Sequence, residues 1–110
     1  MFAQAYSDPS GLPAAKAFTA AYRERFGTAP ARWAAEAYDA VGLIARAARA
    51  TSATGAERER MARRLFLTTH PGITRTLSFY ADRRVRFETG IFLYRVEGGR
   101  ARSLGPYTKV

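Results

Sequence analysis

Apolar residues recur every three or four positions through the first two thirds of the chain, which predicts three amphipathic helices. The first is expected over about 13–26, with Pro13 in its first turn and Gly27 as the left-handed residue that ends it. The second is expected over about 31–51 and the third from 54 to about 69. Before them, residues 2–6 ("FAQAY") are expected to form a short strand.

The second predicted helix has the clearest pattern. Seven residues at i, i+3, i+4 and i+7 spacing form one stripe, which indicates a buried face. Four of the seven are alanines, which let a neighbouring helix or sheet approach closely. The stripe consists of Ala34, Ala37, Tyr38, Val41, Ile44, Ala45 and Ala48, and Trp33, Ala40 and Leu43 are expected to widen it.

The third predicted helix begins at a capping box, in which the Thr54 hydroxyl and the Glu57 carboxylate satisfy each other's backbone amides. "HPG" at 70–72 is expected to end it, because proline cannot continue the amide ladder. This places His70 in a solvated, helix-ending turn. The expected inner face consists of Met61, Ala62, Leu65 and Phe66.

After Gly72 the spacing of apolar residues changes from about 3.6 to 2, which indicates strands. In "ITRTLSF" (73–79), Ile73, Leu77 and Phe79 point to one side, and "YADRR" (80–84) is typical of a turn. Residues 91–105 predict two strands joined at Gly98 and Gly99. The segment should therefore be an α+β fold, with three helices and a small, mostly antiparallel sheet.

The composition argues against an enzyme. The chain has no cysteine and a single histidine, so neither a thiolate nucleophile nor a zinc or histidine metal site is expected. No glycine loop for a nucleotide is present, and no other cofactor is expected. Glu36 and Asp39 could form a carboxylate pair, but exposed helix acids are far commoner. The first residues lack the basic and apolar regions of a signal peptide, and no apolar run is long enough to span a membrane.

The net charge of +9 raises a nucleic-acid hypothesis, because 16 of the 18 basic residues are arginine. The densest groups lie at 58–64 and 82–86, but the arginines are otherwise spread along the chain. A solvated basic surface is therefore the favoured interpretation. A small basic nucleic-acid-binding or regulatory module remains the alternative.

Two aromatic residues are candidates for ligand contact. Trp33 lies in the first turn of the second predicted helix, and Tyr6 ends the first predicted strand. Each is either an ordinary core or rim aromatic or part of the wall of a ligand cleft.

Four motifs in order resemble one family: "F-x-x-A-Y-R-E-R-F-G-T-A-P" (18–30), "A-A-E-A-Y-D-A-V-G-L-I-A-R-A" (34–47), "G-I-T-R-T-L-S-F-Y-A-D-R-R" (72–84) and "I-F-L-Y-R-V-E-G-G-R" (91–100). Together they resemble the C-terminal third of type I periplasmic binding proteins, the branched-chain amino-acid receptors of ABC transporters. Two positions depart from the family. Arg75 stands where a second glycine is usual, and Tyr80 stands where an aspartate precedes a glycine-containing turn.

The resemblance implies an α/β family with two lobes joined by crossing strands and a ligand clamped between them. Residues 1–27 would belong to lobe two, 28–32 to a crossing, and 33–110 to the helices and closing strands of lobe one. It implies a small polar solute such as an amino acid, an ABC transporter permease as partner, and a periplasmic or extracytoplasmic location. Trp33 and Tyr6 would lie near the cleft, and most ligand contacts would come from outside this segment.

The resemblance also implies that the alanine-rich stripe normally packs on a parallel sheet that this chain does not contain. We therefore expect the stripe to be exposed here, as an interaction surface or an aggregation liability. The chain would then either associate with itself as a homo-oligomer or form part of a longer protein. A third hypothesis is a stand-alone remnant that binds nothing and is held together as an oligomer.

Overall fold

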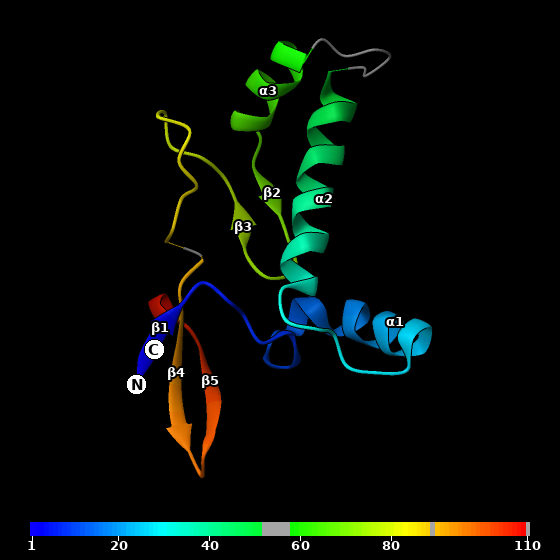
Figure 1. Ribbon diagram of the computed structural model, residues 1–110. Coiled ribbons are helices and arrows are strands. Elements are labelled where there is room, and N and C mark those ends of the chain that lie inside the picture. Colours follow the sequence, from blue (N-terminus) through cyan, green and yellow to red (C-terminus); the bar gives the residue numbers. More distant parts are fainter. Residues whose placement is uncertain (52–57, 89, 110) are drawn as a thin grey trace.

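The computed structural model describes residues 1–51, 58–88 and 90–109. Its three α-helices are α1 (Lys16–Phe26), α2 (Ala34–Ala50) and α3 (Arg58–Phe66). The strands are β1 (Phe2–Gln4), β2 (His70–Pro71), β3 (Thr76–Leu77), β4 (Phe92–Glu97) and β5 (Arg100–Pro106). The predicted α+β fold, with three helices and small antiparallel sheets, is confirmed (Figure 1).

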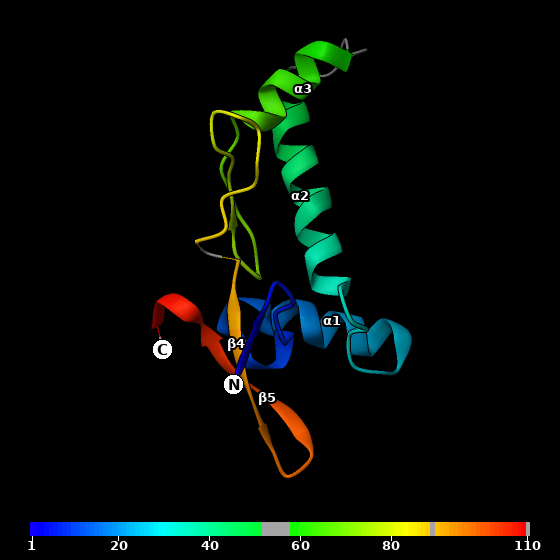
Figure 2. The same ribbon diagram turned by 60° about the vertical axis from the view of Figure 1, so that its left-hand side comes forward.

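A three-stranded sheet joins the two ends of the chain, in the order β1-β4-β5 and with every pair antiparallel. The predicted turn at Gly98 and Gly99 is present, and both residues have positive φ (57° and 76°), as a tight hairpin turn requires. Phe92 and Tyr94 on β4 are buried. The β4–β5 hairpin projects away from the helices in both ribbon views (Figure 2).

Helix α1 is an exposed amphipathic helix with no buried residue. A 3₁₀ turn at Pro13–Ala15 precedes it, so the α-helix begins later than predicted, and it ends as predicted at Gly27, with φ 73°. The rings of Phe18, Tyr22 and Phe26 contact one another in sequence, and Phe18 also contacts Tyr38 of α2, with ring centroids 5.0 Å apart.

Helix α2 is the long upright helix of Figure 1. Its buried residues lie on the side opposite to the predicted stripe. The spacing alone indicated a buried face, whereas the resemblance predicted that the stripe is exposed in this chain, and the exposure is confirmed. Tyr38, Val41 and Ile44 are 56%, 67% and 51% exposed, which agrees with a stripe left without its cover. Leu43, expected to widen the stripe, lies on the other side. The buried residues are Ala35, Asp39, Leu43 and Ala47.

The segment after α3 differs from the prediction. Helix α3 ends at Phe66, and His70–Pro71 forms strand β2, which pairs with β3, so "HPG" is not a helix-ending turn. Pro71 is tolerated in this strand because β2 is only two residues long and pairs with β3 alone among the described strands, so the missing proline N–H leaves no second strand without a donor. On α3 the least exposed residues are the expected inner four, Met61, Ala62, Leu65 and Phe66. The predicted capping box of Thr54 and Glu57 lies outside the described residues.

The predicted turn at 80–84 is present without a glycine. The Tyr80 amide donates to the Arg84 carbonyl at 2.8 Å, and Arg83 takes the left-handed conformation (φ 68°) that glycine favours. Arg83 also lies over the ring of Phe66, 4.9 Å from its centroid. The segment 80–86 therefore packs beside α3.

The molecule is extended. Its radius of gyration is 15.9 Å and its extents are 52 × 34 × 18 Å, whereas a compact domain of this length has a radius of about 13 Å. Only six hydrophobic residues are buried in the described chain: Ala15, Ala35, Leu43, Ala47, Phe92 and Tyr94. Within the described ranges, no helix combines the length and apolar character needed to cross a bilayer.

Candidate ligand-binding site

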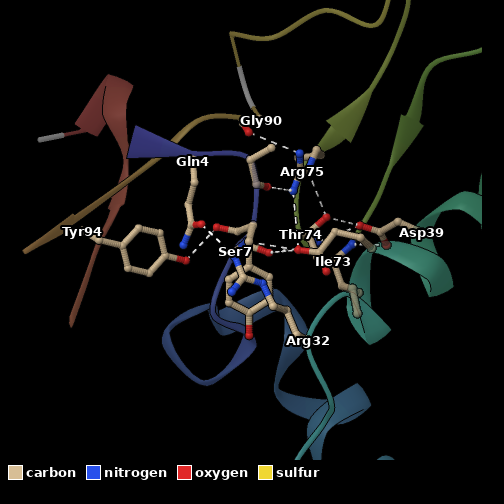
Figure 3. A network of polar contacts seen from close by, with 12 residues as sticks. Gln4, Ser7, Arg32, Asp39, Ile73, Thr74, Arg75, Gly90 and Tyr94 are labelled. Carbon is tan, nitrogen blue, oxygen red and sulfur yellow. Dashed lines mark hydrogen bonds and ion pairs between the residues drawn. The ribbon is translucent and has the colours of Figure 1, made fainter. Parts of the chain in front are cut away.

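Distant parts of the chain meet beside the first turns of α2. The segment after β1, the start of α2, the loop before β3 and the start of β4 converge there, and polar contacts join them (Figure 3). Arg75 is the centre of this junction.

Arg75 links three segments with one guanidinium group. Its Nη2 donates to the Ala5 carbonyl, its Nη1 donates to the Gly90 carbonyl at 3.2 Å, and its Nε donates to the Thr74 hydroxyl at 3.3 Å. Burial lowers the Arg75 pKa from its usual value, and the charges of Glu36 and Asp39 oppose that shift. A mostly buried cation is thus held by two backbone carbonyls and by the carboxylate of Glu36.

Glu36 is the carboxylate nearest to this cation. Its Oε1 lies 3.6 Å from Arg75 Nη2 and accepts hydrogen bonds from the Ser7 amide (3.0 Å) and hydroxyl (2.7 Å). Its side chain is only 16% exposed. The other carboxylate oxygen, Oε2, is buried and has no hydrogen-bond partner among the described residues. This oxygen is an acceptor with unused capacity.

Asp39 lies one turn further along α2 and is 1% exposed, so the interpretation of Glu36 and Asp39 as exposed helix acids is wrong. Its carboxylate accepts the backbone amides of Ile73 (2.8 Å) and Thr74 (2.9 Å) and the Thr74 hydroxyl. Gly72 fits because it has no side chain: a Cβ there would lie 2.4 Å from Asp39 Oδ2. Asp39 therefore anchors the loop that carries Arg75.

Tyr6 and Trp33, the two residues singled out in the sequence, contact each other. Their rings meet edge to face with centroids 5.4 Å apart. The guanidinium carbon of Arg32 lies 4.9 Å from the Tyr6 ring and 5.6 Å from the Trp33 ring. Trp33 precedes α2 in the left-handed region (φ 72°), and its side chain is 46% exposed. Partial burial, with Asp8 and Glu36 nearby, raises the Tyr6 pKa.

A shallow recess of about 240 Å³ opens between Trp33 and the junction. It offers an aromatic surface, an arginine and a carboxylate, which suits non-covalent capture of a small polar molecule. Among the residues described, no group of three or more metal-ligating side chains lies together. The lining residues are Trp33, Glu36, Asp39, Ala40, Thr74, Arg75 and Leu77.

The two arginine-rich segments lie together at the far end of the molecule. Arg83 lies over Phe66, and a hollow of about 350 Å³ has both Arg63 and Arg83 in its lining. The exposed pairs Arg63–Glu59 and Arg84–Asp82 neutralise part of this charge. This end would carry the alternative nucleic-acid function.

Sequence reasoning did not identify Ser7 or Arg75 as functional, and it read Glu36 as a surface acid. The signal for Arg75 was present, because an arginine replaces the glycine that the resembled family has at this position. The signal for Glu36 was its place three residues after Trp33, which puts both side chains near the same end of α2.

No protein-family model matches the sequence, and no curated protein matches it. A solved structure is similar: a solute-binding protein of an ABC transporter from R. palustris, in complex with benzoate. The likeness has a TM-score of 0.72 at 16% sequence identity and covers 94% of this chain. It establishes the fold. The chain spans 28% of the length of that protein.

Proposed function

We propose that the chain is the C-terminal part of a solute-binding component of an ABC transporter, and that it acts without catalysis. The observation that carries this proposal is the fold likeness over 94% of the chain to a protein of that kind. The recess beside Trp33 gives the proposal a site. Since the chain spans 28% of its structural neighbour, the rest of such a binding protein would supply the opposite wall of the cleft.

The solute we propose is an amino acid or a similar small polar molecule. Glu36 Oε2, buried and without a partner among the described residues, suits an N–H or O–H donor of the solute. Arg32, exposed between two rings, suits a carboxylate. The neighbour holds benzoate, a planar carboxylate, so a ring stacked at Trp33 and Tyr6 is a second form of solute that the same side chains would accept.

The proposed mechanism is capture by closure. Two lobes would close over the solute, and differential affinity for the closed form would shift the population towards it. In this scheme Arg75 and Asp39 position the loop 72–75 against α2, and Trp33 and Tyr6 line the entrance. The proposed partner is a transporter permease, and the proposed location is extracytoplasmic.

A titration of the isotope-labelled chain by NMR tests the proposal. Leucine, phenylalanine and benzoate are added separately, with glucose as an uncharged control. One wall of a cleft supplies only part of the binding energy, so we expect millimolar affinity, equivalent to about 4 kcal/mol. The amide shifts should concentrate at Tyr6, Ser7, Trp33, Glu36 and Arg75.

Glu36→Gln separates the forms of solute. Removing this charge should weaken the binding of leucine and phenylalanine, which carry an ammonium group. The binding of benzoate should stay unchanged or become slightly tighter. If no solute shifts these amides, while a short oligonucleotide shifts residues 58–64 and 82–86, the solute-binding proposal fails and the basic-module alternative is supported.

A further inference from the structure

A second recess lies beside α1 and shares no lining residue with the recess at Trp33. Its volume is about 560 Å³, and its lining is mostly apolar. The segment 9–13 and one face of α1 form its walls, and they lie side by side in Figure 1. The lining residues are Pro9, Ser10, Gly11, Leu12, Pro13, Lys16, Thr19, Ala20 and Arg23.

The shape of this recess is set by residues close together in the sequence. Two 3₁₀ turns, Pro9–Gly11 and Pro13–Ala15, precede α1, and each begins with a proline, whose ring fixes φ. The Asp8 carboxylate holds the first turn, because it accepts hydrogen bonds from the Ser10 amide (3.0 Å) and hydroxyl (2.7 Å). Since residues 8–23 supply both walls, the recess needs no covering element from another part of the protein.

Two cations without partners flank the recess. Lys16 and Arg23 are exposed and form no ion pair within the described residues. They are seven positions apart, so they share one face of α1 and lie about 10 Å apart along its axis. Lysine and arginine are almost never fully buried unless they are paired. A longer chain would therefore leave this face open to solvent, unlike the stripe of α2, which contains no charged residue.

Thr19 adds an unused hydroxyl between the two cations. A threonine inside a helix often returns its hydroxyl to a carbonyl of the preceding turn. Thr19 Oγ1 is instead buried and has no hydrogen-bond partner among the described residues. This hydroxyl can donate to an oxygen of a ligand without giving up an existing hydrogen bond.

We propose that this recess binds a small carboxylate with an apolar body, at a site separate from the candidate site described above. The carboxylate accepts charge-assisted hydrogen bonds from Lys16 and Arg23 and a further hydrogen bond from Thr19. The apolar body lies against Leu12 and Ala20. An apolar recess with a few polar groups that converge on one point is typical of sites for small molecules.

An NMR titration of the isotope-labelled chain with hexanoate tests the proposal. Acetate and hexanol are the controls, because they carry the charge and the apolar body separately. Hexanoate should shift the amides of residues 9–23 and bind about tenfold more tightly than either control. Circular dichroism verifies the fold of each variant used below.

Three variants sharpen the test. Arg23→Gln should weaken the binding of hexanoate by about tenfold, because it removes a charged donor. Arg25→Gln is the matched control, since it removes the same charge from the last turn of α1 outside the recess, and it should leave the affinity unchanged. Ala20→Leu fills the recess with a good helix former and should abolish the binding.

The proposal fails if acetate or hexanol binds as tightly as hexanoate, since the recess would then not use both its charge and its apolar lining. Equal losses in Arg23→Gln and Arg25→Gln would also overturn it, because they would indicate attraction to the basic surface as a whole. Hexanoate shifts confined to Trp33, Glu36 and Arg75 would overturn the second site and support the function proposed above.

Discussion

The two faces of α2 differ in the kind of side chain they present and in what covers them. The covered face contains Asp39, which binds two backbone amides and a hydroxyl of the loop 73–74, beside small apolar residues. The bare face carries Val41 and Ile44, which are more than half exposed. A helix on the surface of a soluble protein normally has the opposite arrangement.

This contrast indicates how the chain divides its stabilising contacts. Within the chain, hydrogen bonds between distant segments hold α2 in place, because few large apolar residues are buried there. Most of the apolar surface of α2 is exposed in this chain. Changes on the covered face should therefore lower the stability of the isolated chain, and changes on the bare face should leave it nearly unchanged.

Asp39→Ala should have the largest effect on folding. The substitution leaves the amides of Ile73 and Thr74 and the Thr74 hydroxyl without their acceptor in a buried place. Each unsatisfied group costs about 1–3 kcal/mol, so a loss of about 3 kcal/mol or more is expected. Urea unfolding followed by circular dichroism measures it. Asp39→Asn keeps one acceptor oxygen and should lose less unfolding free energy than Asp39→Ala. Equally small losses of stability in both variants would contradict the anchoring role of Asp39.

Leu43 and Ile44 are neighbours in sequence on opposite faces and allow a direct comparison. Leu43 is 7% exposed and Ile44 is 51% exposed. Leu43→Ala should cost about 2–3 kcal/mol through lost burial and a cavity. Ile44→Ala should change the unfolding free energy by less than about 0.5 kcal/mol at concentrations where the chain is monomeric. The reverse order would mean that the two faces have been assigned wrongly.

Local patterns in the sequence predicted those parts of the fold that depend on neighbouring residues. Gly27 ends α1 because glycine adopts a left-handed conformation without strain, and the pair Gly98 and Gly99 forms a hairpin turn for the same reason. The stripe on α2 was also identified correctly as one apolar face. Its exposure followed only from the resemblance, since periodicity does not tell whether the covering element belongs to the same chain.

Burial of the polar residues could not be predicted in this way. The donors that bind Asp39 lie 34 and 35 positions away, and a periodicity argument counts an aspartate as solvent-facing. Tyr6 and Trp33 were each named as candidates, but their contact depends on how β1 and α2 meet. Nor could the sequence reveal that His70 lies in a strand, because a two-residue strand has no period.

Gly42 lies at the border between the two faces and gives the smallest, most local test. In an exposed helix, replacing glycine by alanine raises the free energy of unfolding by about 1 kcal/mol. Here a Cβ on residue 42 would lie 2.6 Å from His70 Nε2, and Arg46 Nε donates to Nδ1 of that ring at 3.1 Å.

Gly42→Ala must therefore displace the His70 ring from Arg46, and the usual gain should be absent. In a His70→Ala background the same substitution should recover a gain of about 1 kcal/mol, because nothing then opposes the new methyl group. Urea unfolding of the four proteins gives the coupling energy directly. Equal gains in both backgrounds would mean that the His70 ring moves away from α2 at no cost and does not restrict residue 42.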